Sequence, residues 1–95
     1  MEYPFDEMHK NALISSLELV LMSLGNTKYH LFVAKLGAIH DTTVRECYRK
    51  PEYLKAALKE VYQKDYDYII NESKAHLHEL ANEKDIASFF QVMES

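Results

Sequence analysis

Apolar residues recur every three or four positions along almost the whole chain, which is the spacing that predicts helices. The first run follows Asp6, whose carboxylate suits the N-cap of a helix, and it extends to Gly25, a residue that suits a helix end. This run is apolar around much of its circumference, which is typical of a helix central to a core. Its apolar positions are Met8, Ala12, Leu13, Leu17, Val20, Leu21 and Leu24, widened by Ile14, Leu19 and Met22.

A second, shorter helix is predicted from a cap at Asn26 or Thr27 to Gly37, which we expect to end it as Gly25 ends the first. Its apolar side holds Tyr29, Phe32, Val33 and Leu36. Residues 38–40 indicate a connector, with Ile39 expected to be buried as an anchor.

Thr43 and Glu46 have the spacing of a capping box, so we expect a short helix over Thr43–Tyr48. Val44, Cys47 and Tyr48 would face inward from it. Pro51 suits the first turn of the next helix, because its missing N–H has no partner to lose there. That helix is expected to end near Lys64.

Asp65 or Asp67 can start another helix that runs to Leu80. Neither Gly nor Pro marks the break, so whether residues 51–64 and 65–80 form separate helices stays open. Asn82 is a candidate cap for the last helix, which has apolar residues at i, i+3, i+4 and i+7. These residues are Ile86, Phe89, Phe90 and Met93.

The pattern therefore predicts an all-α fold, a single-domain bundle of about five to six short helices. We expect a tail over residues 1–5, core helices over 6–80 and a terminal amphipathic helix over 84–94. The composition agrees, because 47% of the residues are apolar and Gly and Pro together number four. An all-β chain or a disordered chain would need far more turn-forming or polar residues.

Cys47 is the chain's single cysteine, which excludes an internal disulfide and fits a reducing compartment. The first residues are acidic and lack the apolar run of a signal peptide, and no stretch approaches the length of a membrane span. We therefore expect a cytoplasmic protein without a membrane partner. A nucleophilic Cys47 would need a nearby histidine, and no signature of that chemistry surrounds it.

Charge offers one alternative function. The net charge is −4, which disfavours nucleic acid as a partner. Residues 45–59 nevertheless carry a basic patch of Arg45, Arg49, Lys50 and Lys55, which a nucleic-acid-binding transcriptional regulator would use. Adjacent helices of opposite charge that complement each other explain the same pattern and are preferred.

Glu72, His76 and Glu79 share one helical face at i, i+4 and i+7, the only spacing that suggests a metal or small-ligand site. No second helix supplies matching ligands, so a solvated polar face is the preferred interpretation. The chain also lacks a phosphate-binding glycine loop, a Ser-His-Asp arrangement and a carboxylate pair. We therefore expect neither an enzyme nor a bound cofactor.

Protein–protein contact is the function that these observations favour. A chain of 95 residues has a small core, and pairing with another chain, a homodimer included, would add burial. The expected interface combines the terminal apolar stripe with tyrosines, which suit interfaces. Its residues are Phe89, Phe90, Met93, Tyr66 and Tyr68.

The order of these features from Ala12 to Leu80 resembles the small NitrOD-type output domains of ammonia-oxidising archaea. The similarity is carried by Leu21-Met22-Ser23-Leu24-Gly25, the aromatic-rich helix ending near Leu36-Gly37, Pro51-Glu52-Tyr53-Leu54, Leu58 and Val61-Tyr62. The resemblance implies a signal-transduction domain that occurs alone or behind receiver domains, with no established activity and no catalytic residues to transfer. The chain departs from it at Gln63, where a glycine is expected, and over Ile86–Met93, which lies outside the similarity.

Overall fold

The chain folds into helices joined by short turns, as seen in a computed structural model that describes residues 5–95. Among these residues there is no strand, so the predicted all-α class is confirmed. No helix in the described part combines the length and apolar character that crossing a membrane requires. The α-helices are α1 (Glu7–Ser23), α2 (Asn26–His40), α3 (Pro51–Tyr62), α4 (Tyr66–Leu77) and α5 (Lys84–Glu94), with 3-10 turns at Cys47–Arg49, Gln63–Asp65 and His78–Asn82.

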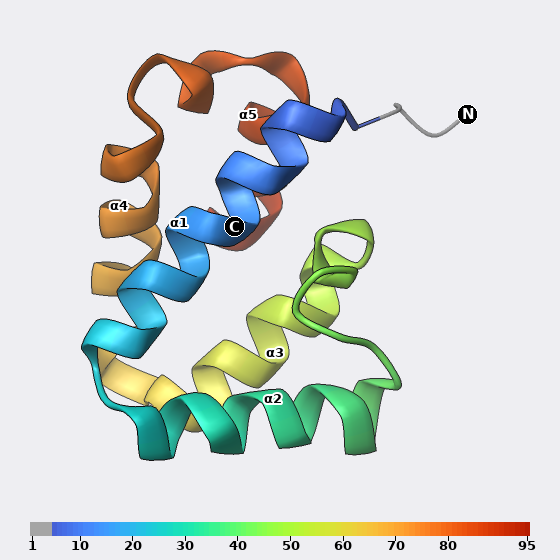
Figure 1. Ribbon diagram of the computed structural model, residues 1–95, viewed down its shortest axis with the longest axis vertical. Helices are drawn as coiled ribbons and strands as arrows, with labels where there is room; N and C mark the ends of the chain where they lie inside the picture. The colour runs from blue at the N-terminus through green and yellow to red at the C-terminus, as the bar shows by residue number, and fades with distance from the viewer. Residues whose placement is uncertain (1–4) are drawn as a thin grey trace.

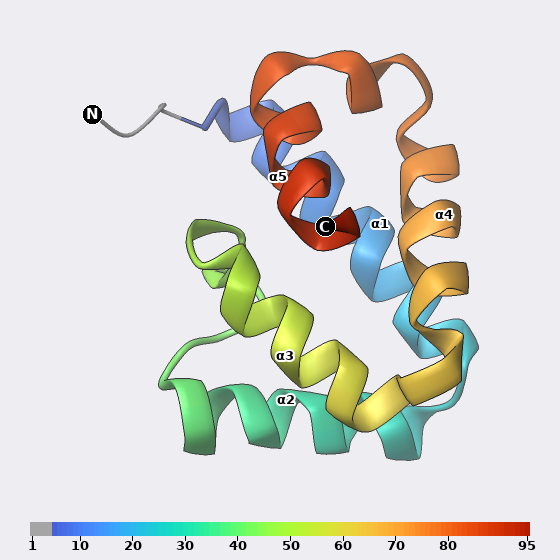
Figure 2. The same ribbon diagram turned by 180° about the vertical axis from the view of Figure 1, so that it is seen from behind.

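The helices form two layers. Helices α1 and α2 lie in front in Figure 1, and α3, α4 and α5 lie in front when the molecule is seen from behind in Figure 2. Within this arrangement α1 packs mainly on α4 and α2 mainly on α3. The first and last helices also touch, so segments from both ends of the described chain lie side by side.

The core between the layers draws on every α-helix. Its largest fully buried side chains are Phe32 from α2, Tyr62 from α3 and Phe90 from α5. Leu13, Leu17 and Leu21 from α1 are at most 1% exposed. Truncating such a leucine to alanine costs about 2–5 kcal/mol, because the lost burial is joined by a cavity.

Two predicted helix starts are confirmed. Asp6 caps α1, and its Oδ1 accepts hydrogen bonds from the backbone N–H groups of Met8 and His9 at 2.8 and 3.1 Å. Pro51 occupies the first turn of α3. A side-chain N-cap of this kind is worth about 1 kcal/mol.

The prediction for the second helix was wrong at both ends. Gly25, with φ +114°, stands at the N-cap position, and no side chain caps the helix. At the other end α2 continues through Gly37 and stops only at Asp41, which adopts the left-handed conformation. Residues 38–40 are therefore helical, and Ile39 is 57% exposed rather than buried. A single glycine weakens a helix without ending it when packing on a neighbour, here α3, favours its continuation.

The helix expected over Thr43–Tyr48 does not form. Turns occupy residues 44–46, where the N–H of Glu46 bonds to the carbonyl of Thr43, and a 3-10 turn follows at Cys47–Arg49. Pro51 opposes helical geometry at the residue before it, and Lys50 is accordingly extended in φ at −129°. Burial of Val44 and Cys47 still anchors the segment to the core.

Residues 51–64 and 65–80 do not form one continuous helix. Helix α3 ends at Tyr62 and α4 begins at Tyr66, because Gln63 adopts a positive φ of 48° that breaks the helix. Another break at His78, φ 52°, ends α4 at Leu77, three residues before the predicted end. Asn82 lies in the following 3-10 turn and does not cap α5, whose N-cap position is Glu83.

The expected tail over residues 1–5 falls mostly outside the described residues, which begin at Phe5. Phe5 is half-buried and packs edge-on against Tyr48, with ring centroids 5.1 Å apart. This residue therefore belongs to the folded body of the protein.

Candidate interaction surface

The interface predicted from the terminal helix is not on the surface. Phe89, Phe90 and Met93 are between 0 and 4% exposed, because α5 packs its apolar stripe into the core of its own chain. The physical reason is the shortness of the chain, which needs the last helix to complete its core. These residues close the protein's own core and cannot meet a partner without unfolding α5.

The two predicted interface tyrosines behave differently. Tyr66 is buried and donates a hydrogen bond of 2.6 Å to the backbone carbonyl of Met93, which ties α4 to the end of α5. Burial raises the pKa of Tyr66 to about 12. Tyr68 alone of the predicted set is exposed.

The structure also separates the predicted metal ligands. Glu72 and His76 lie on α4, but the helix ends at Leu77 and the positive φ of His78 redirects the chain before Glu79. Glu79 therefore leaves the face that the helical spacing predicted. Within residues 5–95 no group of three or more His, Cys, Asp or Glu side chains is placed to hold a metal ion.

Arg45, Arg49 and Lys55 of the predicted basic patch contact groups of their own chain. Arg45 donates a 3.0 Å hydrogen bond to the side chain of Asn11, and Arg49 lies 3.5 Å from Glu46. The ammonium of Lys55 bonds to Ser95 at the end of α5. Lys50 is exposed. The four residues are therefore distributed over the 41–50 segment and the first turns of α3.

Two ion pairs join neighbouring elements, but neither involves the predicted basic residues, so the interpretation of their charge as complementing an adjacent helix stays a prediction. Lys35 of α2 lies 3.0 Å from Glu60 of α3, and Lys74 of α4 lies 3.1 Å from Glu94 of α5. Both pairs are partly exposed, so each adds at most about 1 kcal/mol.

Cys47 has the environment of a core residue. Its side chain is fully buried, and Sγ donates to the carbonyl of Val44 at 2.9 Å. Burial raises the pKa of the thiol to about 12, so almost no nucleophilic thiolate exists at neutral pH.

A shallow groove of about 670 Å³ lies where the start of α1, the 3-10 turn at Cys47–Arg49 and helix α5 meet. Its charged side chains are matched, with Lys10 Nζ 2.7 Å from Glu7 and Asp85 bound to His9. The groove therefore presents no unpaired charge of one sign that would select a ligand.

The outer side of α1 is the first part of a different surface, which lies outside the core and which the charged side chain of Arg45 reaches at Asn11. Exposed Met8, Leu19 and Met22 share this side with exposed Asn11 and Ser15, at spacings of three and four residues. The exposed fractions are 78% for Met8, 58% for Leu19 and 52% for Met22. The opposite side of the same helix is buried and mostly apolar, so α1 carries apolar residues on both sides.

The outer side of α2 continues this surface with mostly small residues. Leu31 is the largest apolar side chain on it and is 48% exposed. The residues that share this side are Thr27, His30, Leu31, Ala34, Gly37 and Ala38, all exposed. We refer to these six residues and the five of α1 together as the outer face.

The outer face carries no Asp, Glu, Lys or Arg. Of the chain's 11 basic and 15 acidic residues, residues 11–44 hold only Glu18, Lys28, Lys35 and Asp41. Three of these contact groups on a neighbouring element: Glu18 accepts from Tyr29 Oη at 2.8 Å, Lys28 lies 4.0 Å from Asp65, and Lys35 pairs with Glu60. Asp41 ends α2. Glu18, Lys28 and Lys35 are therefore engaged by neighbouring elements, while the exposed Asp41 lies at the end of the outer side of α2.

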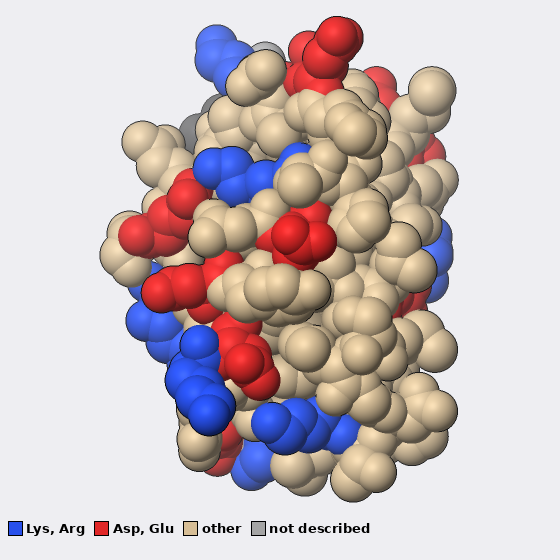
Figure 3. All heavy atoms as spheres, turned by 90° about the vertical axis from the view of Figure 1, so that its left-hand side faces the viewer, with Lys and Arg blue, Asp and Glu red and all other residues tan. Residues whose placement is uncertain are grey.

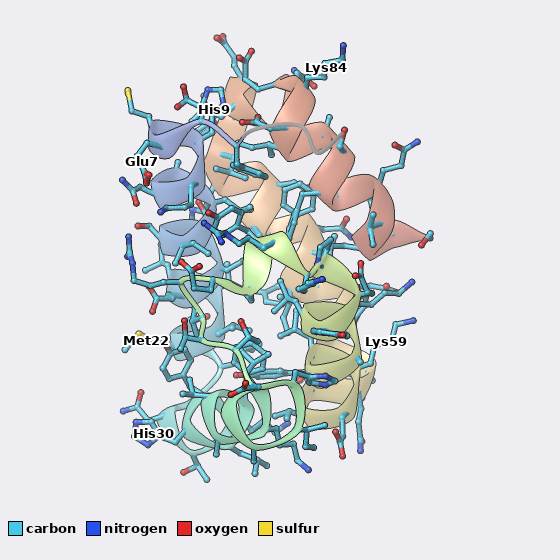
Figure 4. All side chains as sticks on the ribbon, turned by 90° about the vertical axis from the view of Figure 1, so that its right-hand side faces the viewer. Glu7, His9, Met22, His30, Lys59 and Lys84 are labelled. Carbon is cyan, nitrogen blue, oxygen red and sulfur yellow. The ribbon has the colours of Figure 1, made fainter. Side chains whose placement is uncertain are left out.

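The figures show the same division of the surface. In Figure 3 the charged side chains gather on the half of the view toward α4, while the half toward α1 is largely free of them. In Figure 4 the labelled Met22 of α1 and His30 of α2 project to the same side, away from α3 and α5. The outer sides of the two helices thus contribute to one side of the molecule.

Sequence reasoning missed this surface because it assigned the whole width of the first apolar run to the core. Leu19 and Met22 make the apolar stripe wider than one packing partner can cover, and this width could have indicated an exposed apolar side. The near absence of charge over residues 11–44 was a second signal.

Comparison of the chain with protein-family models, curated proteins and solved structures finds no match, so the outer face itself is the basis for a functional proposal.

Proposed function

We propose that this protein is a non-enzymatic, cytoplasmic interaction domain of a regulatory kind, which works by binding another protein chain on its outer face. The observation that carries the proposal is an exposed, partly apolar surface spanning two helices without any Asp, Glu, Lys or Arg. Depletion of charged residues and enrichment of methionine are among the features that distinguish the centre of protein interfaces from ordinary surface.

Exposure of these residues in the isolated chain has a cost that binding would remove. Met8, Leu19 and Leu31 are each about half exposed or more, and transfer of such side chains from water stabilises a complex by about 25 cal/mol per Å² of apolar area. Exposed apolar side chains grouped on one side of a soluble protein mark interaction sites.

The dimensions of the outer face suit a protein partner. Helices of 17 and 15 residues are about 26 and 23 Å long at 1.5 Å per residue and about 10 Å wide. Their outer sides therefore cover roughly 500 Å² of flat footprint, and the accessible area is larger because side chains project from it. Stable interfaces bury about 800 Å² per partner, and weaker ones less than about 600 Å².

Site-specific photo-crosslinking tests the proposal. A photoreactive phenylalanine analogue is introduced at Leu19 or Ala34 of the outer face, and, as matched controls, at the exposed helical positions Ala56 and Ala75. Irradiation is carried out in cells that produce the protein. We expect discrete crosslinked bands from the outer-face positions and none from the controls.

Equal crosslinking from all four positions, or no crosslinking from Leu19 and Ala34, would show that the outer face binds no protein. The mass of the crosslinked product identifies the partner as a second copy of the 11.1 kDa chain or as a different protein. Both results agree with the proposed function, because in each case a protein is bound on the outer face.

A further inference from the structure

We infer that the partner of the outer face is a second copy of this chain, paired about a two-fold axis that passes beside Ala34 of α2. This inference rests on the proposed function and names its partner. A two-fold interface requires a surface that is complementary to itself, and α2 meets that requirement in side-chain size and in charge.

The exposed side chains on this side of α2 are larger before Ala34 and smaller after it. In an antiparallel crossing centred on Ala34, residues at equal distances before and after it face each other. Leu31 of each copy then lies opposite Gly37 of the other, three positions away on either side. His30 lies opposite Ala38 in the same way. The larger residue of each pair meets the smaller one, so both copies interdigitate.

Gly37 supplies the space that Leu31 needs. A Cβ built at Gly37 has nothing within 4 Å, so the backbone there is open to the approach of another side chain. Glycine in the interior of a helix costs about 1 kcal/mol relative to alanine. An exposed glycine within a helix is favourable when a second helix packs against it, because the missing side chain lets the two helices approach closely.

Electrostatics also favour a second copy. Each chain carries a net charge of −4, so two copies that met through charged faces would bring like charges together. The residues that make up the outer face avoid this repulsion because none carries a formal charge; the charged groups at its edges are Arg45, which bonds to Asn11, and Asp41 at the end of α2. Lys10, Lys28 and Lys35, each adjacent in sequence to a residue of the outer face, lie close to carboxylates of their own chain.

Methionine and leucine side chains of α1 extend the contact beyond α2. Met22 and His30 project to the same side of the molecule in Figure 4, and Leu19 lies one turn before Met22. These side chains flank the α2 strip and bring the paired area toward the size of a small, reversible dimer.

The test measures molar mass by light scattering after size exclusion over a concentration series of the purified full chain. We expect the mass to rise from 11.1 kDa toward twice that value as concentration increases. The Ala34→Glu variant should remain at the monomer mass throughout, because it places two carboxylates against each other at the axis. Ala75→Glu, an identical change at an exposed position of α4, should dimerise like the unmodified chain.

A charge-swap experiment tests the two-fold axis itself. Ala34→Lys should also be monomeric, whereas an equimolar mixture of Ala34→Lys and Ala34→Glu should regain the dimer mass. Recovery requires that position 34 of one copy faces position 34 of the other. Circular dichroism of each variant checks that the helical fold is retained, since Ala34 is exposed and both replacements are good helix formers.

Three results would overturn the inference: a monomer at every concentration, a dimer that survives Ala34→Glu, or a mixture of the charge variants that stays monomeric. A monomer combined with photo-crosslinks from Leu19 to a different protein would contradict pairing with a second copy but support the proposed function. A monomer without such crosslinks would contradict both the pairing and the proposed function.

Discussion

His9 and Asp85 join the two ends of the described chain. The Nδ1 atom of His9 lies 3.0 Å from both carboxylate oxygens of Asp85, which connects the first turn of α1 to the first turn of α5. Asp85 also accepts hydrogen bonds from the backbone N–H of Asp6 at 3.1 Å and of Ile86 at 2.7 Å. One carboxylate therefore holds the starts of two helices together.

This pair predicts how stability depends on pH. The hydrogen bond to Asp85 raises the pKa of His9 above 6.5, against the opposing effect of desolvation. Because the folded pKa is raised, the stabilisation is fully present below pH 6.5 and is lost as pH rises through the raised value. For Asp85, burial acts to raise the pKa, but hydrogen bonds from Asp6, His9 and Ile86 outweigh it and lower the pKa below 3.8. Its contribution is present above pH 3.8 and is lost as pH falls through the lowered value.

We therefore expect the melting temperature to be highest between about pH 4 and 6.5 and to fall above that range. The replacement His9→Gln, which keeps a hydrogen-bond donor but cannot be protonated, should flatten the decline on the alkaline side. Thermal unfolding followed by circular dichroism from pH 3 to 9 measures both curves. Parallel curves for the two proteins would show that His9 is not the titrating group.

Tyr66→Phe should destabilise the fold by about 1 kcal/mol or slightly more. The change removes the hydroxyl that donates to the carbonyl of Met93 at 2.6 Å and leaves that carbonyl without this partner beside the core. Tyr68→Phe is the matched control on the same helix, because Tyr68 is half exposed. Urea unfolding should separate the two variants; equal midpoints would contradict the assigned role of the Tyr66 hydroxyl.

Gln63→Gly should stabilise the protein by about 1 kcal/mol. Gln63 adopts φ 48° and ψ −111°, a conformation that glycine accepts easily and that costs other residues about 1–3 kcal/mol. The same replacement at Gln91, an exposed position within α5, should be destabilising, because it weakens a helix without relieving strain. Chemical denaturation that gives both changes the same sign would exclude backbone strain at Gln63.

Gly37→Ala should stabilise the monomer by about 0.5–1 kcal/mol, since Gly37 lies within α2 and a methyl group there meets nothing within 4 Å. The measurement uses the Ala34→Glu background, so that pairing contributes nothing to the unfolding free energy. Gly25→Ala is the contrasting variant and should be destabilising, because φ at Gly25 is +114°. A loss of stability from Gly37→Ala would mean that the helix is not free of strain there.

Cys47 should resist thiol reagents in the native protein at pH 7. Its side chain is fully buried and its pKa is raised to about 12, so both access and the reactive thiolate are lacking. Reaction with a chromogenic disulfide should occur at the rate of unfolding and become rapid in denaturant. Fast labelling under native conditions would contradict the burial of this residue.

Local features of the sequence determined the class of fold and several helix boundaries. Helical spacing of apolar residues is a property of the chain itself, and so are the carboxylate of Asp6 and the fixed φ of Pro51. The all-α class and the starts of α1 and α3 were therefore predictable. The stripe of α5 was visible too, as the alternation of buried and exposed residues along that helix shows.

Tertiary structure decided which apolar surfaces are covered. Phe89 and Leu19 are similar in sequence terms, each on an apolar helical stripe, yet Phe89 is 4% exposed and Leu19 is 58% exposed. Packing on α3 likewise favours the continuation of α2 beyond Gly37. The positive φ of His78 ends α4 and separates Glu79 from Glu72 and His76. Burial depends on which elements meet in space, and spacing along one helix does not contain that information. The sequence thus determined that there would be apolar helices, and only the arrangement of the two layers left the outer face of α1 and α2 exposed.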